Sequence, residues 1–328
     1  MKYDLFCIGD VTIDIFLEIE ESQANVFCDL DQKNCKLSLN YADKIPVKKI
    51  YRTYAAGNAA NVAIGGSRLG LKTGLYSVLG DDEDAKKILR TLKKEKVNTR
   101  YLIFEKNSSN NLSVILGYQG ERTVLSFHEE RIYSFPQIPE TRWLYFTSMA
   151  PRHEIFYKKL PSFIKKSKIK LAFNPGSYQL RQGLRVLRPL LFQTDVLILN
   201  KEEAEFLFGA QKDIPALLKK ILEEGCKLAV LTDGGKGSWA SDGSKIYFLP
   251  SSGTLPVDKT GAGDSYTAGF LAALLYNKEV AEAMRWGTLN ASSVISQIGT
   301  HNGLLKKAEL EKILLTRLDL KPKIFQIS

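Results

Sequence analysis

Short apolar runs alternate with amphipathic segments through much of the chain. The apolar runs cover residues 3–9, 143–147, 169–174, 195–200 and 227–232. Segments with helical spacing of their apolar residues separate them, at 153–167, 178–190, 201–208 and 213–224. Strands that are apolar throughout and bracketed by helices are typical of a parallel sheet covered on both faces. The pattern therefore predicts an α/β fold with a mostly parallel central sheet.

Alternation of apolar and polar residues, which is typical of strands with one exposed face, appears in two other stretches. It occurs around residues 36–39 and 45–51, and over 101–128 with breaks at 106–111 and 119–120. We expect the segments at about 18–52 and 101–128 to form a small accessory β-sheet. Because no linker rich in Pro or Ser divides the chain, residues 1–328 are expected to form a single domain.

Polar residues follow the first apolar run, where ligands of open α/β sheets collect. Thr12 and Asp14 lie there, just beyond the end of the run at residue 9. Further on, Gly57 precedes Asn58, Asn61 and a small-residue helix that we expect to end near residue 70. Such small residues let a ligand approach the start of a helix, although tight packing against the sheet would require them as well.

The segment of residues 258–264, Asp-Lys-Thr-Gly-Ala-Gly-Asp, opens an apolar helical run that continues to residue 275. The backbone N–H groups of Gly261, Ala262 and Gly263 can converge at the positive end of the helix dipole and attract an anion. We call residues 261–263 the anion cradle. Asp264 would lie beside it as a proton acceptor, an arrangement that suits phosphoryl transfer to a hydroxyl. The alternative is that Asp264 only caps the helix.

Two further polar groups stand where later strands are expected to end. Asn200 and Glu203 form an NxxE pattern, which is either a helix capping box or a pair of oxygen ligands. Residues 232–237, Thr-Asp-Gly-Gly-Lys-Gly, form a second glycine-rich turn.

The distribution of charged residues argues against nucleic acid and membrane as partners. The chain has 46 basic and 36 acidic residues and a net charge of +10, but the basic residues are dispersed among acidic ones. Basic clusters such as 165–170 are therefore read as solvated helix faces, and no nucleic-acid partner is expected. Charged residues interrupt the first 16 positions, so we expect neither a signal peptide nor a membrane anchor there.

The four cysteines, Cys7, Cys28, Cys35 and Cys226, are too few and too scattered for a disulfide scaffold. Six residues separate Cys28 from Cys35, and the two could be bridged or hold a metal, but no His is nearby. Reduced cysteines in a cytoplasmic protein are the simplest expectation.

The segment of residues 258–264 closely resembles the second signature of the ribokinase-like (PfkB) carbohydrate kinases, D-T-T-G-A-G-D. Gly57, Ala59, Asn61 and Ala63, followed by Gly70 and Gly80, resemble the first signature, about 200 residues earlier. The resemblance extends from the first strand to about residue 305. It implies the ribokinase-like fold and ATP-dependent phosphorylation of a sugar-like alcohol. In that family the small sheet forms a lid over the sugar site, often against a second subunit, so a homodimer through the lid is a further expectation.

The resemblance also implies a role for each matching position. Asp264 matches the catalytic base, and Gly261, Ala262 and Gly263 match the anion hole. The positions matching substrate contacts are Thr12, Asp14, Gly57, Asn58 and Asn61. The positions matching nucleotide contacts are Asn200, Glu203, Thr232, Gly234, Gly237 and Thr288, with Mg²⁺ bound through water near Glu203. Asp258 and Thr260 match the loop that in many members holds a monovalent cation such as K⁺.

Several departures from the family pattern leave the substrate open. Ribokinase itself usually has Asn where Thr12 stands and Lys where Asn58 stands, so ribose is not implied. Lys259 replaces the usual Thr of the signature, and its ammonium would either take the place of the monovalent cation or point into solvent.

The chain lacks the P-loop, protein-kinase, GxSxG and HExxH motifs, and His128, His153 and His301 are its only histidines. We expect the first two at the surface or in the lid and His301 in the nucleotide-side turn. The alternatives to a sugar kinase are a nucleoside kinase of the same superfamily, which would need an aromatic or apolar slot for the base, and a sugar- or nucleotide-binding regulator without activity.

Overall fold

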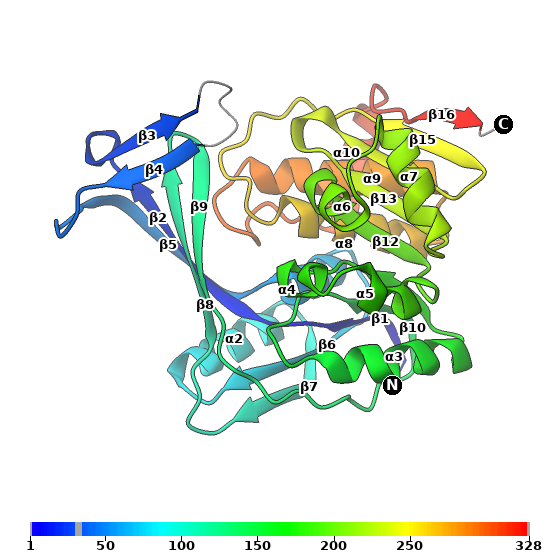
Figure 1. Ribbon diagram of the computed structural model, residues 1–328, viewed down its shortest axis with the longest axis horizontal. Helices are drawn as coiled ribbons and strands as arrows, with labels where there is room; N and C mark the ends of the chain where they lie inside the picture. The colour runs from blue at the N-terminus through cyan, green and yellow to red at the C-terminus, as the bar shows by residue number, and fades with distance from the viewer. Residues whose placement is uncertain (1, 30–34, 327–328) are drawn as a thin grey trace.

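The computed structural model describes residues 2–29 and 35–326, and its centre is a ten-stranded sheet (Figure 1). The strands lie in the order β16-β15-β14-β13-β12-β11-β10-β1-β6-β7. Their bounds are β1 (Tyr3–Ile8), β6 (Thr73–Gly80), β7 (Asn98–Glu105), β10 (Thr141–Phe146), β11 (Lys170–Phe173), β12 (Val196–Asn200), β13 (Leu228–Thr232), β14 (Ser238–Ser241), β15 (Lys245–Leu249) and β16 (Lys323–Gln326). The pairs from β7 to β13 are parallel, and β14, β15 and β16 add antiparallel edge strands. The expected mostly parallel sheet is confirmed.

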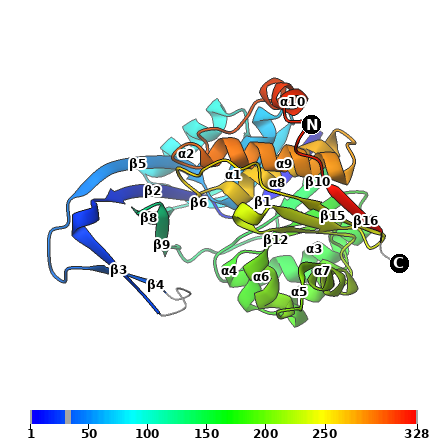
Figure 2. The ribbon, with the colours of Figure 1, turned by 90° about the horizontal axis from the view of Figure 1, so that it is seen from above.

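Helices cover both faces of this sheet, as the sequence pattern predicts (Figure 2). One layer consists of α1 (Asn58–Arg68), α2 (Glu83–Lys94), α8 (Ala262–Leu275), α9 (Val280–Ile295) and α10 (Lys307–Thr316). The other consists of α3 (Glu154–Lys166), α4 (Ser177–Arg181), α5 (Leu184–Leu191), α6 (Lys201–Phe208) and α7 (Ile214–Glu223). Alternate residues of one strand enter the two cores: Leu5 and Cys7 pack under the first layer, and Phe6 and Ile8 under the second.

A four-stranded sheet in the order β5-β2-β8-β9 projects from the body (Figure 1), and we refer to it as the lid. It contains β2 (Thr12–Ile19), β5 (Val47–Ala56), β8 (Asn111–Tyr118) and β9 (Glu121–Phe127). A separate hairpin of β3 (Ala24–Cys28) and β4 (Cys35–Leu39) lies beyond it, with a short 3₁₀ turn at Glu21–Gln23 before β3.

The bounds expected for the small sheet are partly wrong. Residues 101–105 belong to β7, which pairs with β6 at the edge of the large sheet, whereas the lid already begins at Thr12. Alternation of apolar and polar residues indicates a strand with one exposed face. An edge strand of the large sheet can have an exposed face as well, so the pattern does not tell the two sheets apart. The helix expected over 178–190 is also two helices, because Gly183 interrupts it with a positive φ of 77°.

Cys28 and Cys35 form a disulfide, contrary to the expectation of reduced cysteines. The reason is the register of the hairpin, which places the two residues directly opposite each other with their Cα atoms 4.0 Å apart. Cys7 and Cys226 are buried free thiols. Cysteine usage therefore no longer supports the expectation of a reducing compartment. No helix in the described ranges has the length and apolar character needed to span a bilayer.

Candidate active site

A cavity of about 260 Å³ lies where the start of β2, the start of α1, the start of α8 and the inner side of the lid meet. The structure brings most of the expected acceptor-side residues to its wall. They are Thr12, Asp14, Gly57, Asn58, Asn61, Gly261 and Asp264. Thr260, expected in the cation loop, lines the same wall. Residues more than 200 positions apart in the chain thus converge on one space, at the carboxyl end of β1.

The anion cradle forms the turn before α8. Gly261 is the N-cap of the helix in the left-handed conformation, with φ at 78°, and no side chain caps the first N–H groups. A Cβ atom at Gly261 would lie 3.0 Å from the side chain of Thr300, so the turn requires glycine for both conformation and space. The Ala262 N–H donates one long hydrogen bond of 3.4 Å to the Lys259 carbonyl, and the N–H groups of Gly261 and Gly263 together with the helix dipole favour an anion here. Because Gly261 occupies the N-cap, the interpretation of Asp264 as a mere capping residue is wrong.

Asp264 lies in the first turn of α8 and is held by Asn61 of α1. The Asn61 Nδ2 donates a hydrogen bond of 2.7 Å to Oδ2 of Asp264. Burial raises the pKa of Asp264 to about 6, while the hydrogen bond from Asn61 and the positive charge of Arg122 oppose that rise. The carboxyl group is therefore mostly ionised at neutral pH and close to the pKa that suits a general base. Asn61, expected to bind substrate, orients Asp264 in this structure.

His301 completes this arrangement behind Asn61. Its Nε2 lies 3.0 Å from Oδ1 of Asn61, and burial lowers the pKa of the imidazole to about 4. A neutral ring can donate from Nε2, which leaves the Asn61 amide nitrogen facing Asp264. The expectation of His301 as a part of the nucleotide-side turn is therefore revised. No sequence signal joins it to Asn61, because the two residues are 240 positions apart.

Of the other two histidines, His153 differs from expectation, whereas His128 directly follows lid strand β9 and agrees with it. His153 is fully buried rather than at the surface, and its Nδ1 and Nε2 contact the Ala150 carbonyl and the Tyr157 hydroxyl at 2.6 and 2.9 Å. His128 lines the cavity, and its Nδ1 is buried without a hydrogen-bond partner in the described part of the chain. Thr300, absent from our sequence-based site, has an equally unpartnered Oγ1 in the same wall. Unpaired buried polar atoms of this kind are suited to a polar ligand.

Asp14 faces the same cavity from β2. It accepts a hydrogen bond of 3.1 Å from the Thr12 hydroxyl, and burial raises its pKa to about 6, with repulsion from Asp264 adding to the rise. Asp10 is different in kind, because Tyr133 donates to both of its oxygens and the Ala150 N–H to one of them. Asp10 therefore ties loops together, whereas Asp14 retains acceptor capacity for a ligand hydroxyl.

The expected nucleotide-side residues lie at neighbouring strand ends but do not line this cavity. Asn200 at the end of β12 is in register with Thr232 at the end of β13. Asn200 and Glu203 form the capping box in full, with bonds of 2.7 and 3.0 Å. Burial raises the pKa of Glu203 to about 7, and repulsion from Asp264 adds to it, so the two carboxyl groups lie within electrostatic reach.

The remaining nucleotide-side positions are structurally constrained. At Gly237, which follows the short 3₁₀ turn Gly234–Lys236, a Cβ atom would lie 2.2 Å from the carbonyl oxygen of Leu249. Gly234 has a positive φ of 49°, and Thr288 is buried on α9. Within the described ranges, no group of three or more His, Cys, Asp or Glu could hold a metal. Glu203 therefore suits a divalent ion only if nucleotide phosphates and water supply the other ligands.

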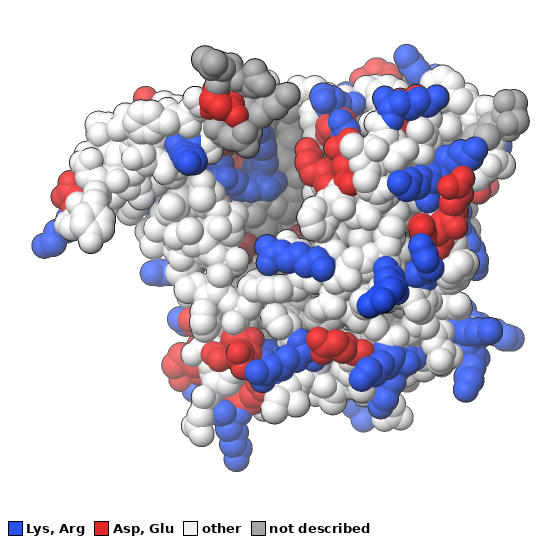
Figure 3. Space-filling view, in the orientation of Figure 1, with Lys and Arg blue, Asp and Glu red and all other residues white. Residues whose placement is uncertain are grey.

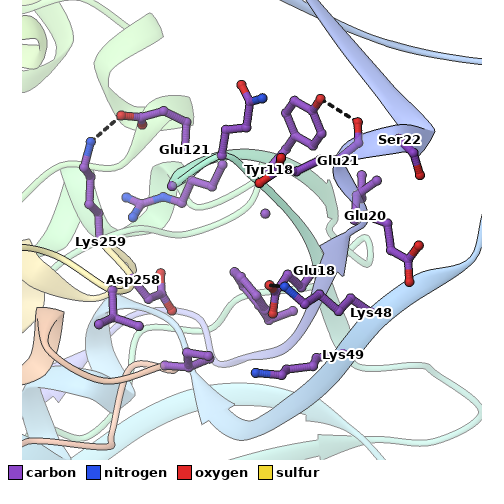
Figure 4. A pocket seen from close by; sticks show the side chains of 18 residues that line it. Glu18, Glu20, Glu21, Ser22, Lys48, Lys49, Tyr118, Glu121, Asp258 and Lys259 are labelled. Atoms are coloured by element: carbon purple, nitrogen blue, oxygen red, sulfur yellow. Dashed lines mark hydrogen bonds and ion pairs between the residues drawn. The ribbon is translucent and has the colours of Figure 1, made fainter.

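The loop before the anion cradle holds Asp258 in a fixed position. Its Oδ1 accepts from the N–H and hydroxyl of Thr260 at 2.8 and 2.6 Å, and its Oδ2 accepts from the N–H of Gly299 at 3.0 Å. Lys259 neither replaces a cation at Asp258 nor points freely into solvent. Its ammonium forms an ion pair with Glu121 of the lid strand β9, on the other side of a hollow (Figure 4).

The chain is similar to known proteins over most of its length. The model of the pfkB family carbohydrate kinases matches residues 22–307. A sugar kinase of Archaeoglobus fulgidus is 25% identical over 252 residues, covering 75% of this chain and 100% of the relative. The nucleoside kinase of Methanocaldococcus jannaschii, an archaeal member of the ribokinase family, superposes with a TM-score of 0.77 at 22% identity, covering 96% of this chain and 99% of that one.

The ribokinase of Arabidopsis thaliana, solved with ribose and ATP, superposes with a TM-score of 0.78 at 21% identity, again covering 96% and 99% of the two chains. These likenesses extend over the body and the lid, and the family model includes the helix starts that carry Asn61 and Asp264. The chain therefore has the ribokinase-like fold and belongs to the pfkB family of carbohydrate kinases.

Proposed function

We propose that the protein is an ATP-dependent kinase that phosphorylates a hydroxyl group of a sugar or sugar-like molecule. The observation that carries this proposal is the position of Asp264 beside the anion cradle and opposite Asp14, in one cavity. A proton acceptor, an anion site and a second hydrogen-bond acceptor for the ligand are the groups that phosphoryl transfer to an alcohol requires.

The chemistry follows from these positions. Asp264 accepts the proton of the acceptor hydroxyl, and the hydroxyl oxygen forms a bond to the γ-phosphorus of ATP. The bond from that phosphorus to the β–γ bridging oxygen breaks, and ADP leaves with the electron pair. The N–H groups of residues 261–263 stabilise the negative charge on the transferred group. Asp14 holds the acceptor by a second hydroxyl, and Asn61 keeps the carboxyl group of Asp264 in position.

ATP and Mg²⁺ are assigned to the strand-end residues on the nucleotide side. Asn200, Glu203, Thr232, Gly234, Gly237 and Thr288 are proposed to contact the nucleotide, and Glu203 to hold Mg²⁺ through water. The ion supplies neutralisation of phosphate charge. Asp258 and Thr260 are proposed to lie next to a monovalent cation such as K⁺, a role that Lys259 does not fill because Glu121 holds its ammonium.

A nucleoside kinase remains the second candidate, because the lid supplies the aromatic surface that a base would need. The rings of Phe16 and Tyr51 lie 6.2 Å apart between centroids, and Phe16 is two residues from Asp14 on the same strand. The nucleoside kinase of Methanocaldococcus jannaschii has the same fold. A non-catalytic regulator is disfavoured, because a pure binding protein has no need of a carboxyl group beside an anion cradle.

Acceptor-dependent release of ADP tests the proposal. Purified protein, ATP and Mg²⁺ are combined with single sugars, sugar phosphates, sugar acids or nucleosides in a coupled assay. At least one acceptor should raise ADP release well above the rate with ATP alone, and excess EDTA should abolish the increase. No increase with any class of acceptor would contradict the proposed function.

A further inference from the structure

The lid has an inner face directed toward the body. Residues two apart on a strand share a face, so Asp14, Phe16 and Glu18 of β2 lie on the same side. Asp14 lines the active-site cavity, while Phe16 and Glu18 line a larger hollow of about 630 Å³. This hollow lies between the lid and residues 257–259, and Figures 3 and 4 show it with basic side chains in it.

Strand register places a charged row across this inner face. Glu18 is paired with Lys49 of β5 and with Gly117 of β8, and Gly117 is paired with Arg122 of β9. Arg122 lines both the large hollow and the active-site cavity. Its guanidinium group therefore reaches from the charged row into the space that contains Asp264.

An apolar band separates the charged row from Asp14. Phe16 is paired with Tyr51 and Ile115, and Ile115 with Val124. The ring of Phe16 covers Gly117, where a Cβ atom would lie 2.4 Å from it. Glu18 is four residues from Asp14, which at about 3.3 Å per residue is about 13 Å along the strand. From Asp14 outward along β2, the inner face thus presents a carboxylate that can accept a hydrogen bond from a hydroxyl, then an apolar surface, then cations.

Arg122 and Lys49, the cations at the far end of this inner face, have no directly bonded anion among the residues that the structure describes. Glu18 forms an ion pair of 3.1 Å with Lys48, and Glu121 is paired with Lys259. Neither Arg122 nor Lys49 has an ion pair or a side-chain hydrogen bond within the described ranges. Both side chains are exposed and therefore accessible to a ligand, and a phosphate or carboxylate matches a guanidinium group in a bidentate geometry.

We propose that the acceptor carries an anionic group, a phosphate or a carboxylate, which binds Arg122, with Lys49 as a second cation. The inference names the substrate class of the proposed kinase and therefore rests on that function. A neutral acceptor leaves the guanidinium group without a directly bonded anion, so where both members of a pair fit the cavity, the anion-bearing member is the better substrate. The phosphates of ATP are the competing partner for Arg122, and the test below separates the two.

The test compares pairs of acceptors that differ in whether they carry an anionic group, on the wild type and on two arginine variants. The pairs are D-fructose with D-fructose 6-phosphate, D-ribose with D-ribose 5-phosphate, and D-glucose with D-gluconate. Each is assayed for kcat/KM with the wild type, Arg122→Gln and Arg52→Gln. Arg52 is the control because it is an exposed arginine of the same sheet, in register with Ile15 on the opposite face. The wild type should prefer the anionic member of at least one pair.

In Arg122→Gln that preference should fall about 10- to 100-fold, the range expected for losing a charged hydrogen bond, while Arg52→Gln should retain it. A wild type that prefers the neutral member of every pair would overturn the inference. So would an equal loss for both members in Arg122→Gln, since that result would place the guanidinium group on ATP.

Titration calorimetry without ATP separates this inference from the proposed function. If no acceptor is phosphorylated, but an anionic probe binds more tightly than its neutral partner and loses that advantage in Arg122→Gln, the kinase function fails and the anion site stands. If both probes of every pair bind equally or not at all, the anion site fails.

Discussion

At the scale of single residues, the site is defined by carboxyl groups whose pKa values are raised. Burial raises the pKa of Asp14 and Asp264 to about 6 and that of Glu203 to about 7, and Asp264 adds repulsion to both of the others. Carboxyl groups perturbed by burial and by one another are characteristic of functional sites. Burial also raises the pKa of Asp10 to about 6, but its oxygens accept hydrogen bonds from Tyr133. Asp14, Asp264 and Glu203 are therefore the better candidates for contact with a ligand.

These pKa values predict the pH dependence of activity. A general base acts in its ionised form, so kcat/KM should rise with pH through the pKa of Asp264 near 6 and level off at higher pH. Glu203, whose pKa is raised to about 7, also ionises as the pH rises, and this should likewise increase kcat/KM. Below pH 6 the rate should fall about tenfold per pH unit or more steeply. The measurement is kcat/KM from pH 5 to 9 at constant ionic strength.

Reversibility provides the control for this prediction. Protein held at pH 5 and returned to pH 8 should recover full activity, which separates titration from denaturation. A flat profile down to pH 5 would mean that no carboxyl group with a raised pKa takes part in the rate.

Sequence reasoning identified the residues at strand and helix starts but missed their partners. Asp264, Asn61 and Asp14 follow from local patterns, because glycine turns and strand ends mark where ligands bind. Thr300 and Arg122 line the same cavity and His301 contacts Asn61, from loops and a lid strand that carry no local signal. Their roles depend on which segments pack together, and a single sequence does not record that.

At the scale of elements, the lid and the cradle loop are tied by one ion pair. Glu121 begins β9, and Lys259 stands in the loop before α8, so the pair of Lys259 and Glu121 spans the mouth of the hollow. Lys259 was expected either to replace a cation or to be free, because its partner lies 138 positions earlier in the chain. Similarly, the alternation that predicted lid strands does not distinguish β7, an edge strand of the large sheet, from β8 and β9.

This ion pair should hold the lid against the loop before α8 by a small free energy. Both side chains are largely exposed, at 46% and 74%, and exposed pairs are worth about 0.2–1 kcal/mol. Lys259→Thr and Glu121→Gln should therefore each raise KM for the acceptor by about 1.5- to 5-fold. The double variant should add little to either single change. Additive effects of the two substitutions would show that the residues act independently.

At the scale of the whole molecule, the outer face of the lid carries several exposed apolar side chains. Ile50, Leu125 and Phe127 are 50%, 56% and 51% exposed, and strand register places all three on the face opposite Asp14. An apolar surface of this kind marks an interaction site. The expectation of a homodimer through the lid therefore remains a proposal, now with a defined surface.

Light scattering checks this proposal. The wild type should have twice the mass of one chain at micromolar concentration, and Leu125→Glu should have the mass of one. Leu255→Glu is the matched control, because Leu255 is 87% exposed on a loop outside the lid and should leave the dimer intact. A wild type that stays monomeric would contradict the proposal.

In the proposed function, Asp264 accepts the proton of an acceptor hydroxyl during phosphoryl transfer. The most direct measurement is kcat of wild type and Asp264→Asn for the best acceptor, together with the binding of acceptor and ATP to both proteins. Asparagine keeps the shape and can still accept the bond from Asn61, so binding should change little. Loss of a general base should lower kcat by about 10²- to 10⁴-fold. A variant that retains more than about a tenth of wild-type kcat would contradict the account.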